Sequence, residues 1–160
     1  MDTSPSGSPH GSSHSASHSA SHSASNISAA LEFVRRNHHA VLATTRSDAT
    51  PQLSPVLVGV DGDGRLLVST RETAAKTRNL RRDPRAHVCA FTDRFHGSWV
   101  QVGGTAEIVS LPEAMNGLVE YYRGISGEHP DWDDYRRAME AEGRVLIRIT
   151  PTSAGPLTSG

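Results

Sequence analysis

Short runs of β-branched and other apolar residues, separated by turn residues, constrain the fold of this chain more than any other feature. The runs at 51–60 and 65–70 are joined by the sequence DGDG at 61–64. Aspartate and glycine tolerate the positive φ angles that a tight turn between two strands requires. The two runs are therefore predicted to form a β-hairpin.

Six strands and four helices are expected along the chain. The helices are predicted from apolar residues at helical spacing and from prolines or capping residues near their starts, with Thr73 as a cap. Strand and helix do not alternate, which argues for an antiparallel barrel with appended helices rather than a doubly wound nucleotide-binding sheet. The expected strands lie at 40–45, 51–60, 65–70, 86–92, 98–109 and 144–150, and the expected helices at 27–37, 74–82, 111–125 and 131–142.

Two adjacent glycines, Gly103 and Gly104, interrupt the run that is expected to form the strand at 98–109. Glycine inside a strand is typical of a β-bulge or of a place where another backbone approaches closely. The pairing of this strand is therefore expected to be irregular at the glycine pair.

The first 25 residues differ in composition from the rest of the chain, and the folded domain is expected to span residues 26–160. They are mainly Ser, Ala, Gly, Pro and His, and a segment without large apolar side chains cannot offset the entropy of ordering it. The tail at 1–25 is therefore predicted to be disordered. Histidines four residues apart, from His14 through His18 to His22, would line one face of a helix, but without a fixed cavity no metal site is predicted.

The charge balance argues against a general attraction to nucleic acid or to anionic membranes. The chain has 16 Lys and Arg against 17 Asp and Glu, a formal net charge of −1, so any anion site has to be local. The single cysteine, Cys89, excludes a disulfide framework and a cysteine zinc site, and it is interpreted as a buried thiol. Neither a membrane span nor a signal peptide is recognisable, and a cytoplasmic protein is expected.

The segment TAAKTRNLRRDPRA at residues 73–86 indicates such a local anion site, because it carries five cations and one acid. On a helix, Lys76 lies near the face that Leu80 would bury and in the first turn, where the helix dipole disfavours a cation. A phosphate would compensate, since a helix N-terminus with an inner lysine and the hydroxyls of Thr73 and Thr77 is suited to bind one. A lysine whose stem packs while its ammonium group reaches water would explain the same pattern.

Four segments taken together resemble the split-barrel flavin and deazaflavin oxidoreductases related to pyridoxamine 5′-phosphate oxidase. The resemblance covers about residues 27 to 156, and within that family the sequence is most similar to the actinobacterial branch that uses coenzyme F420. It implies a mainly β fold with helices, a six-stranded antiparallel split β-barrel of the FMN-binding type, that works as a homodimer with cofactor sites at the interface. The segments are VLATTRSDATPQLSPV, AAKTRNLRRDPRA, VGGTAEIV and GEHPDWDDYRRAM.

The same resemblance implies which residues contact the cofactor. The segment 51–56 would line the ring, the end of the next strand would approach it, and a lysine would contact the phosphate. Arg78 either meets the anionic oligoglutamate tail of a deazaflavin or belongs to a solvated face, and Trp99 either flanks the ring across the dimer interface or packs in the core. Relatives often carry a second basic residue where this chain has Ala74, and Arg71 is the candidate replacement. The implied cofactor-binding residues are Gln52, Ser54, Val56, Ser69, Thr70, Lys76, Thr77, Arg78 and Trp99.

By the same resemblance, the chain is expected to be an F420H2-dependent reductase that transfers a hydride to an unsaturated or quinone-like small molecule. The alternatives are an FMN-binding oxidase or flavin reductase, and a non-catalytic protein that binds a cofactor or a haem-like molecule. No catalytic residue is assigned, because water could deliver the proton. The adjacent His38 and His39 are expected to face opposite sides of their strand. His129, Trp132 and Tyr135 are interpreted as packing and helix-start residues.

Overall fold

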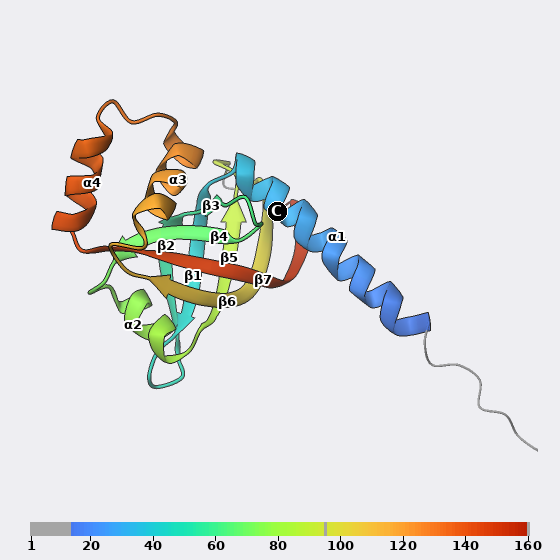
Figure 1. The fold of residues 1–160 in the computed structure, drawn as a ribbon. Helices are drawn as coiled ribbons and strands as arrows, with labels where there is room; N and C mark the ends of the chain where they lie inside the picture. Colours follow the sequence, from blue (N-terminus) through green and yellow to red (C-terminus); the bar gives the residue numbers. More distant parts are fainter. Residues whose placement is uncertain (1–13, 95, 160) are drawn as a thin grey trace, which may run out of the picture.

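The computed structural model describes residues 14–94 and 96–159, and its centre is a curled antiparallel sheet of seven strands (Figure 1). The strands follow the order β2-β1-β5-β6-β7-β4-β3 across the sheet. The predicted fold class, a mainly β split barrel with helices, is confirmed, although the predicted strand number of six is wrong. The strands are β1 (His39–Thr45), β2 (Pro51–Leu57), β3 (Gly59–Val60), β4 (Leu66–Arg71), β5 (Arg85–Phe91), β6 (Ser98–Val109) and β7 (Arg144–Ser159).

The number of strands differs from the prediction because the run 51–60 is divided at Val58. β2 pairs with β1 at one edge of the sheet, whereas β3 pairs with β4 at the other edge. Val58 is fully buried at this crossing, and its N–H donates to the carbonyl oxygen of His38 at 2.8 Å. A single run of strand-forming residues thus crosses from one edge of the sheet to the other, which periodicity alone cannot distinguish from a single strand.

Gly103 and Gly104 lie where the pairing of β6 with β7 is irregular, as predicted. The register shifts between the two glycines. A Cβ at Gly104 would collide with the carbonyl oxygen of Thr150 and would lie 2.8 Å from Cγ2 of Ile149. Both a bulge and a close backbone approach are therefore present. β7 also continues beyond its predicted end at residue 150, because β6 supplies pairing partners as far as Ser159.

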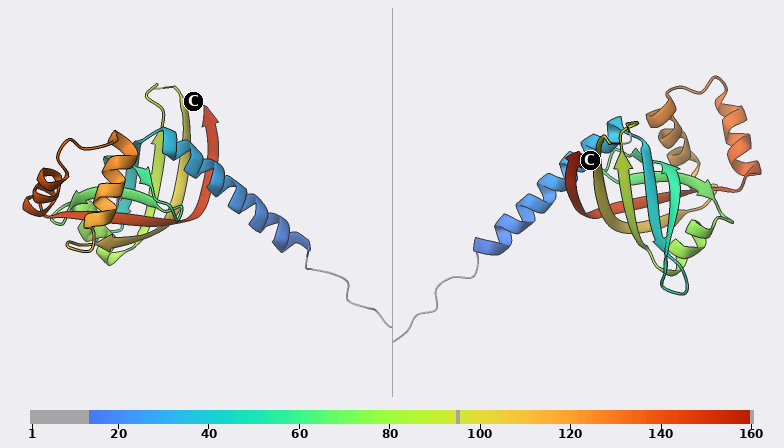
Figure 2. Two further views of the ribbon diagram at one scale, coloured as in Figure 1. Left: turned by 45° about the horizontal axis from the view of Figure 1, so that its top comes forward. Right: turned by 180° about the vertical axis from the view of Figure 1, so that it is seen from behind.

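The described part of the chain has four α-helices around the sheet (Figures 1 and 2). The C-terminal half of α1 packs on the barrel and its N-terminal part extends beyond it, while α3 and α4 lie together on another side (Figure 2). None of the helices in residues 14–94 and 96–159 combines the length and the apolar character that a membrane span requires. The helices are α1 (His14–Arg36), α2 (Ala75–Arg82), α3 (Met115–Ser126) and α4 (Trp132–Ala141).

The helix α1 begins at His14, so the predicted helix start at residue 27 is wrong. Residues 14–25 of the tail that is predicted to be disordered belong to this helix in the structure, and the disorder of the tail stays a prediction. This stretch contains alanine but neither glycine nor proline, so no residue in it breaks a helix that the buried residues of α1 hold in place. Residues 1–13 of the predicted tail lie outside the described residues. The domain boundary at residue 26 stays a prediction.

The apolar core has two parts. The larger part fills the barrel under α1, and the smaller part lies between the other face of β4 and β7 and the helices α3 and α4. Alternation along β4 separates the two, since Val68 belongs to the first part and Leu67 to the second. Fully buried members of the larger part include Leu42, Val68, Val88 and Ile147, and of the smaller part Leu118 and Leu146.

The N-terminal caps of α2 and α4 differ. Asp131 caps α4, because its side chain accepts the backbone N–H groups of Asp133 and Asp134 at 3.0 and 2.9 Å. The cap position of α2 is Ala74, which makes no side-chain hydrogen bond, so the prediction of Thr73 as a cap is wrong. The start of α2 is therefore left without the acceptor that a capping side chain provides.

The side chains around the start of α4 form an aromatic cluster. Rings of Tyr122, His129, Trp132 and Tyr135 lie with centroids 5.0 to 5.8 Å apart. The hydroxyl of Tyr135 donates to the carbonyl oxygen of Leu118 at 2.9 Å, and burial raises the pKa of Tyr135 to about 12. The prediction that this segment has packing and helix-start roles is confirmed.

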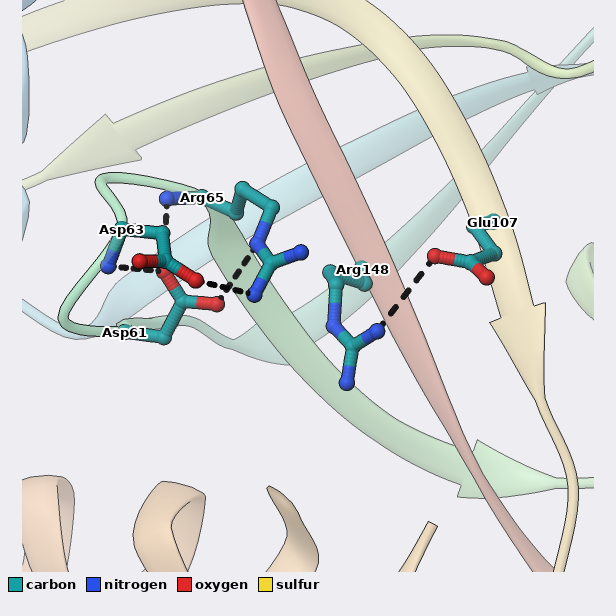
Figure 3. Close-up of polar contacts among 5 residues, drawn as sticks. All are labelled: Asp61, Asp63, Arg65, Glu107 and Arg148. Carbon is teal, nitrogen blue, oxygen red and sulfur yellow. Dashed lines mark hydrogen bonds and ion pairs between the residues drawn. The ribbon is translucent and has the colours of Figure 1, made fainter. Parts of the chain in front are cut away.

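The DGDG turn between β3 and β4 depends on Asp61 (Figure 3). Oδ1 of Asp61 accepts the backbone N–H groups of Asp63 and Arg65 at 3.0 and 2.9 Å, and Oδ2 accepts Nε of Arg65 at 2.8 Å. The Asp61 side chain is only 7% exposed. Gly64 has the positive φ, 76°, that the turn requires. The nearby pair of Arg148 and Glu107 joins β7 to β6 at 3.4 Å.

Replacing Asp61 by alanine is expected to lower the free energy of unfolding by about 2 to 3 kcal/mol, because two backbone N–H groups and the guanidinium of Arg65 lose their shared acceptor. Asp63→Ala is the matched control, since the Asp63 side chain is 78% exposed. Asp63 forms an exposed ion pair with Arg65, and an ion pair on the surface contributes about 0 to 1 kcal/mol to the free energy of unfolding. Urea denaturation of both variants measures the difference, and equal losses would contradict the role assigned to Asp61.

Candidate functional site

A cleft of about 310 Å³ lies at the N-terminal end of α2, beside the end of β4. Arg71 is the last residue of β4 and pairs directly with Arg144 at the start of β7. Lys76 comes from the first turn of α2. Cations from different elements therefore meet in one place, which we name the cationic cleft. Its lining residues are Thr70, Arg71, Thr73, Ala74, Lys76 and Arg144.

Lys76 is half-buried in the cationic cleft. Its ammonium nitrogen Nζ lies 3.4 Å from Oγ1 of Thr70, to which it donates a hydrogen bond. Burial lowers the pKa of Lys76, and the positive charge of Arg144 lowers it further. A pKa lowered by these two causes is expected for a cation that has too little negative charge around it. They agree with the expectation that an anion compensates this lysine.

The carboxylate of Glu142 borders the cleft and binds its arginines. Oε2 of Glu142 accepts a hydrogen bond from Nε of Arg144 at 2.8 Å, Nη2 of Arg144 lies 2.6 Å from the same oxygen, and Nη2 of Arg71 lies 3.6 Å away. The hydrogen bond from Arg144 is the main reason that the pKa of Glu142 is lowered. Together with Lys76, these groups leave a net charge of about +2, which suits an anionic ligand.

The N-terminus of α2 opens towards the cleft without a capping side chain, and its first turn contains no acidic residue. Thr77, predicted to help bind phosphate, is buried, and its hydroxyl donates to the carbonyl oxygen of Arg71 at 2.8 Å. Thr77 thus anchors α2 to the end of β4. The dipole of α2 adds to the positive potential at its N-terminal turn, where Ala74 and Lys76 line the cleft.

Gln52, Ser54 and Val56 lie on the inner face of β2, because alternate residues of the strand face the barrel. Ser54 is buried, and Oε1 of Gln52 accepts Nδ2 of Asn79 at 3.2 Å. The same nitrogen of Asn79 donates to Oγ1 of Thr44 at 3.0 Å. This polar cluster connects α2 to β1 and β2. The three residues of β2 lie outside the lining of the cationic cleft, and their contact with a cofactor ring stays a prediction.

Ser69 and Arg78 also lie outside the lining of the cationic cleft. Ser69 faces the side of β4 that α3 covers, where the hydroxyl of Tyr121 donates to the carbonyl oxygen of Leu57 at 3.0 Å. Burial raises the pKa of Tyr121, and a hydrogen bond from the backbone of Ser69 opposes that shift. Arg78 is exposed, and its guanidinium donates to the carbonyl oxygen of Thr73.

A second cavity, of about 490 Å³, lies on the outer face of β1, β5 and β6. Trp99 lines this cavity and does not line the cationic cleft. Within a single chain, the residue predicted to flank the cofactor ring therefore lies in a different cavity from Lys76, which is predicted to contact the phosphate. Cys89 is half-buried here, which corrects its interpretation as a buried thiol, and burial raises its pKa. We name this the aromatic cavity; its lining residues are His39, Cys89, Phe91, Thr92, Asp93, Gly97 and Trp99.

Arg144 is a candidate site residue that the sequence did not reveal. It begins an ordinary strand, and no motif surrounds it; only the pairing of β4 with β7 brings it opposite Arg71. Arg71 itself lies in the cleft with Ala74, where a replacement for the missing basic residue was expected. Among residues 14–94 and 96–159, no group of three or more His, Cys, Asp or Glu side chains is placed to hold a metal ion.

Comparisons with known proteins connect this geometry to a family. The family model described as pyridoxamine 5′-phosphate oxidase matches residues 27–156. A conserved hypothetical protein from Mycobacterium tuberculosis is 28% identical, with a TM-score of 0.65 over 79% of this chain and 81% of that chain. An F420 reductase is 22% identical, with a TM-score of 0.61 over 78% of this chain and 94% of that one. A heme binding protein from Mycobacterium smegmatis is 18% identical, with a TM-score of 0.62 over 86% of this chain and 57% of that one. At these last two identities the likeness shows a shared fold.

Proposed function

This chain belongs to the pyridoxamine 5′-phosphate oxidase family, and from that premise we propose that it is an F420H2-dependent reductase. Its reaction is the transfer of a hydride to an unsaturated or quinone-like small molecule. The observation that carries the proposal is the cationic cleft, in which Arg71, Lys76 and Arg144 converge beside the uncapped start of α2. The solved F420 reductase of the same fold supports the choice of cofactor.

The donor set of the cleft fits the anionic end of such a cofactor. Two guanidinium groups and an ammonium group are the strongest partners that side chains offer to a phosphate or a carboxylate. Thr70 and Thr73 add hydroxyl groups to the same lining. A net charge of about +2 suits one phosphate together with a carboxylate of an oligoglutamate tail, or the phosphate of FMN alone.

The residues of this chain would hold and orient the cofactor. When bound, a reduced deazaflavin supplies a hydride, and the protein supplies position and charge. Lys76 and Arg144 would fix the phosphate end at the cleft, and Arg71 would hold it from the end of β4. Because the geometry of these cations is set by α2, β4 and β7, the cleft is built on rigid elements.

We further propose that the chain acts as a homodimer with the cofactor sites at the subunit interface. Leu53 and Leu57 of β2 are 66% and 42% exposed, and Phe91 of β5 is 36% exposed. Large apolar side chains on one sheet mark a surface that another protein covers. Light scattering measures the mass in solution, and a monomer at micromolar concentration would refute the homodimer.

The free thiol of Cys89 is compatible with the cytoplasmic location that the sequence predicts.

Fluorescence titration of the cofactor-free protein with F420 and, separately, with FMN tests the choice of cofactor. We expect F420 to bind more tightly. A preference for FMN would favour the oxidase or flavin reductase, whose phosphate fits the same cleft. Binding of neither cofactor would overturn the proposed function. Tight binding of F420H2 without oxidation of the cofactor by any acceptor would favour a non-catalytic binding protein; a heme binding protein is among the solved structures with this fold.

A further inference from the structure

Glu142 lies at the junction between α4 and β7 (Figure 1), beside the cations of the cleft. It is the residue that follows α4, and its backbone N–H donates to the carbonyl oxygen of Ala138 at 2.9 Å. Gly143 comes next with a φ of 59°, and its carbonyl oxygen accepts the backbone N–H of Glu72 at 2.9 Å. The junction is therefore bound to the segment that follows β4, which holds Glu142 in place.

A single carboxylate reduces the positive charge of the cationic cleft. Glu142 forms ion pairs with Arg71 and Arg144, and among residues 14–94 and 96–159 no other carboxylate pairs with a cation of the lining. The acid next to Arg71 in the chain, Glu72, bonds instead to the guanidinium of Arg81 at 3.0 and 2.8 Å. The three cations of the lining would have a charge of +3 without Glu142, and with it they have about +2.

The charge of Glu142 affects which phosphate esters the cleft prefers. A phosphate monoester such as FMN carries about two negative charges above its second pKa of about 6, whereas a phosphate diester such as that of F420 carries one. The repulsion between a carboxylate and a monoester is therefore about twice its repulsion of a diester. The hydrogen bond from Arg144 lowers the pKa of Glu142, so its carboxylate is charged at neutral pH. Glu142 thus reduces the advantage that a doubly charged ligand has in a cleft of cations.

We propose that Glu142 is a specificity-determining residue, which shifts the preference of the cationic cleft from phosphate monoesters towards phosphate diesters. Its side chain is 37% exposed and that of Arg144 is 27% exposed, so water screens these charges only in part. The consequence for the cofactor, a preference for F420 over FMN, rests on the proposed function. The selection by charge is tested separately, with two flavins that differ in one charge.

The test compares FMN with its phosphate methyl ester, because these ligands share the ring and the ribityl chain and differ in one negative charge. Fluorescence titration of the full, cofactor-free chain at pH 7.5 measures both dissociation constants. The result is the ratio of the dissociation constant of the methyl ester to that of FMN. In Glu142→Gln we expect this ratio to rise roughly fivefold, since loss of a carboxylate favours the ligand with two charges more than the ligand with one.

Two control variants separate the charge of Glu142 from other effects. Glu142→Asp keeps the charge and should keep the ratio of the unaltered chain. Glu128→Gln removes a carboxylate that bonds to Arg123 and Trp132 before the start of α4, outside the cleft, and it should leave both dissociation constants unchanged. Raising the salt concentration from about 50 to about 500 mM should reduce the effect of Glu142→Gln, because salt screens charges. Circular dichroism checks that the variants are folded.

Three results would overturn the inference. The ratio is unchanged in Glu142→Gln, which would mean that Glu142 only positions Arg144; or the ratio rises as much in Glu142→Asp or Glu128→Gln; or neither flavin binds to the unaltered chain or to Glu142→Gln. Failure of the proposed function is distinguishable from these results, because the F420 titration decides it. A chain that binds FMN more tightly than F420 would still show the rise in the ratio.

Discussion

A protein with alanine in place of both Lys76 and Arg144 is expected to bind coenzyme F420 at least about 100-fold more weakly than the unaltered chain. Each side chain would lose a charge-assisted hydrogen bond to the anionic end of the cofactor. A single Lys76→Ala variant is expected to lose about 1.5 to 3 kcal/mol of binding free energy. Fluorescence titration with F420 measures both values.

The effect of the double substitution is expected to be large because the two cations share one cleft. Lys76 has a lowered pKa from burial and from the charge of Arg144, so a bound anion relieves a repulsion as well as making new bonds. Arg144 already donates to Glu142, and its removal also takes away the group that holds this carboxylate at the cleft border. Of the three cations that line the cleft, the double variant would keep Arg71 alone.

Two matched variants make this prediction specific. Arg85→Ala removes a cation whose guanidinium bonds to Asp83 outside the cleft, and it should leave the dissociation constant unchanged. Glu142→Gln removes the carboxylate that competes for Arg144, and it should tighten binding of F420 several-fold. An unchanged dissociation constant in a folded double variant, or weaker binding by Glu142→Gln, would contradict the assignment of the cleft.

Replacing Gly104 by valine is expected to lower the free energy of unfolding by about 3 kcal/mol or more. The collision is with backbone, since a Cβ at Gly104 meets the carbonyl oxygen of Thr150. Backbone of β7 cannot move away without disturbing its pairing with β6 on one side and β4 on the other. Urea denaturation followed by circular dichroism measures the loss.

Gly124→Ala is the control for the glycine substitution. Gly124 lies in α3, and a Cβ there would have no neighbour within 4 Å. This variant is expected to gain about 0.5 to 1 kcal/mol, because alanine is the better helix former. A loss below about 1 kcal/mol for Gly104→Val would show that β6 and β7 adjust to the side chain and that the close approach is not essential.

The cationic cleft illustrates how much of the site can be predicted from local pattern. Lys76 was singled out because helical periodicity placed it near Leu80 and in the first turn of a helix, and both features depend only on neighbouring residues. Thr77 shares that turn, yet its hydroxyl bonds to Arg71, because the contact depends on where β4 ends. Arg144 was missed, because its position follows from strand register across distant segments.

The strands show the same difference between features that neighbouring residues determine and features that distant segments determine. The DGDG turn and the glycine pair were predicted correctly, because each reflects the backbone freedom of the residues themselves. The division of the run 51–60 into two strands was not predicted, because Val58 is as apolar as its neighbours. Only the barrel requires the chain to pass from one edge of the sheet to the other at this residue.

The sequence by itself determined the kinds of element, their order, and the family, since these depend on local patterning and on motifs that a single chain displays. The tertiary structure decided which cations meet, that Gln52 and Ser54 face the barrel interior, and that Trp99 lies in a separate cavity. The physical reason is that strand pairing and helix docking join residues far apart in the chain, and side-chain type does not specify that register.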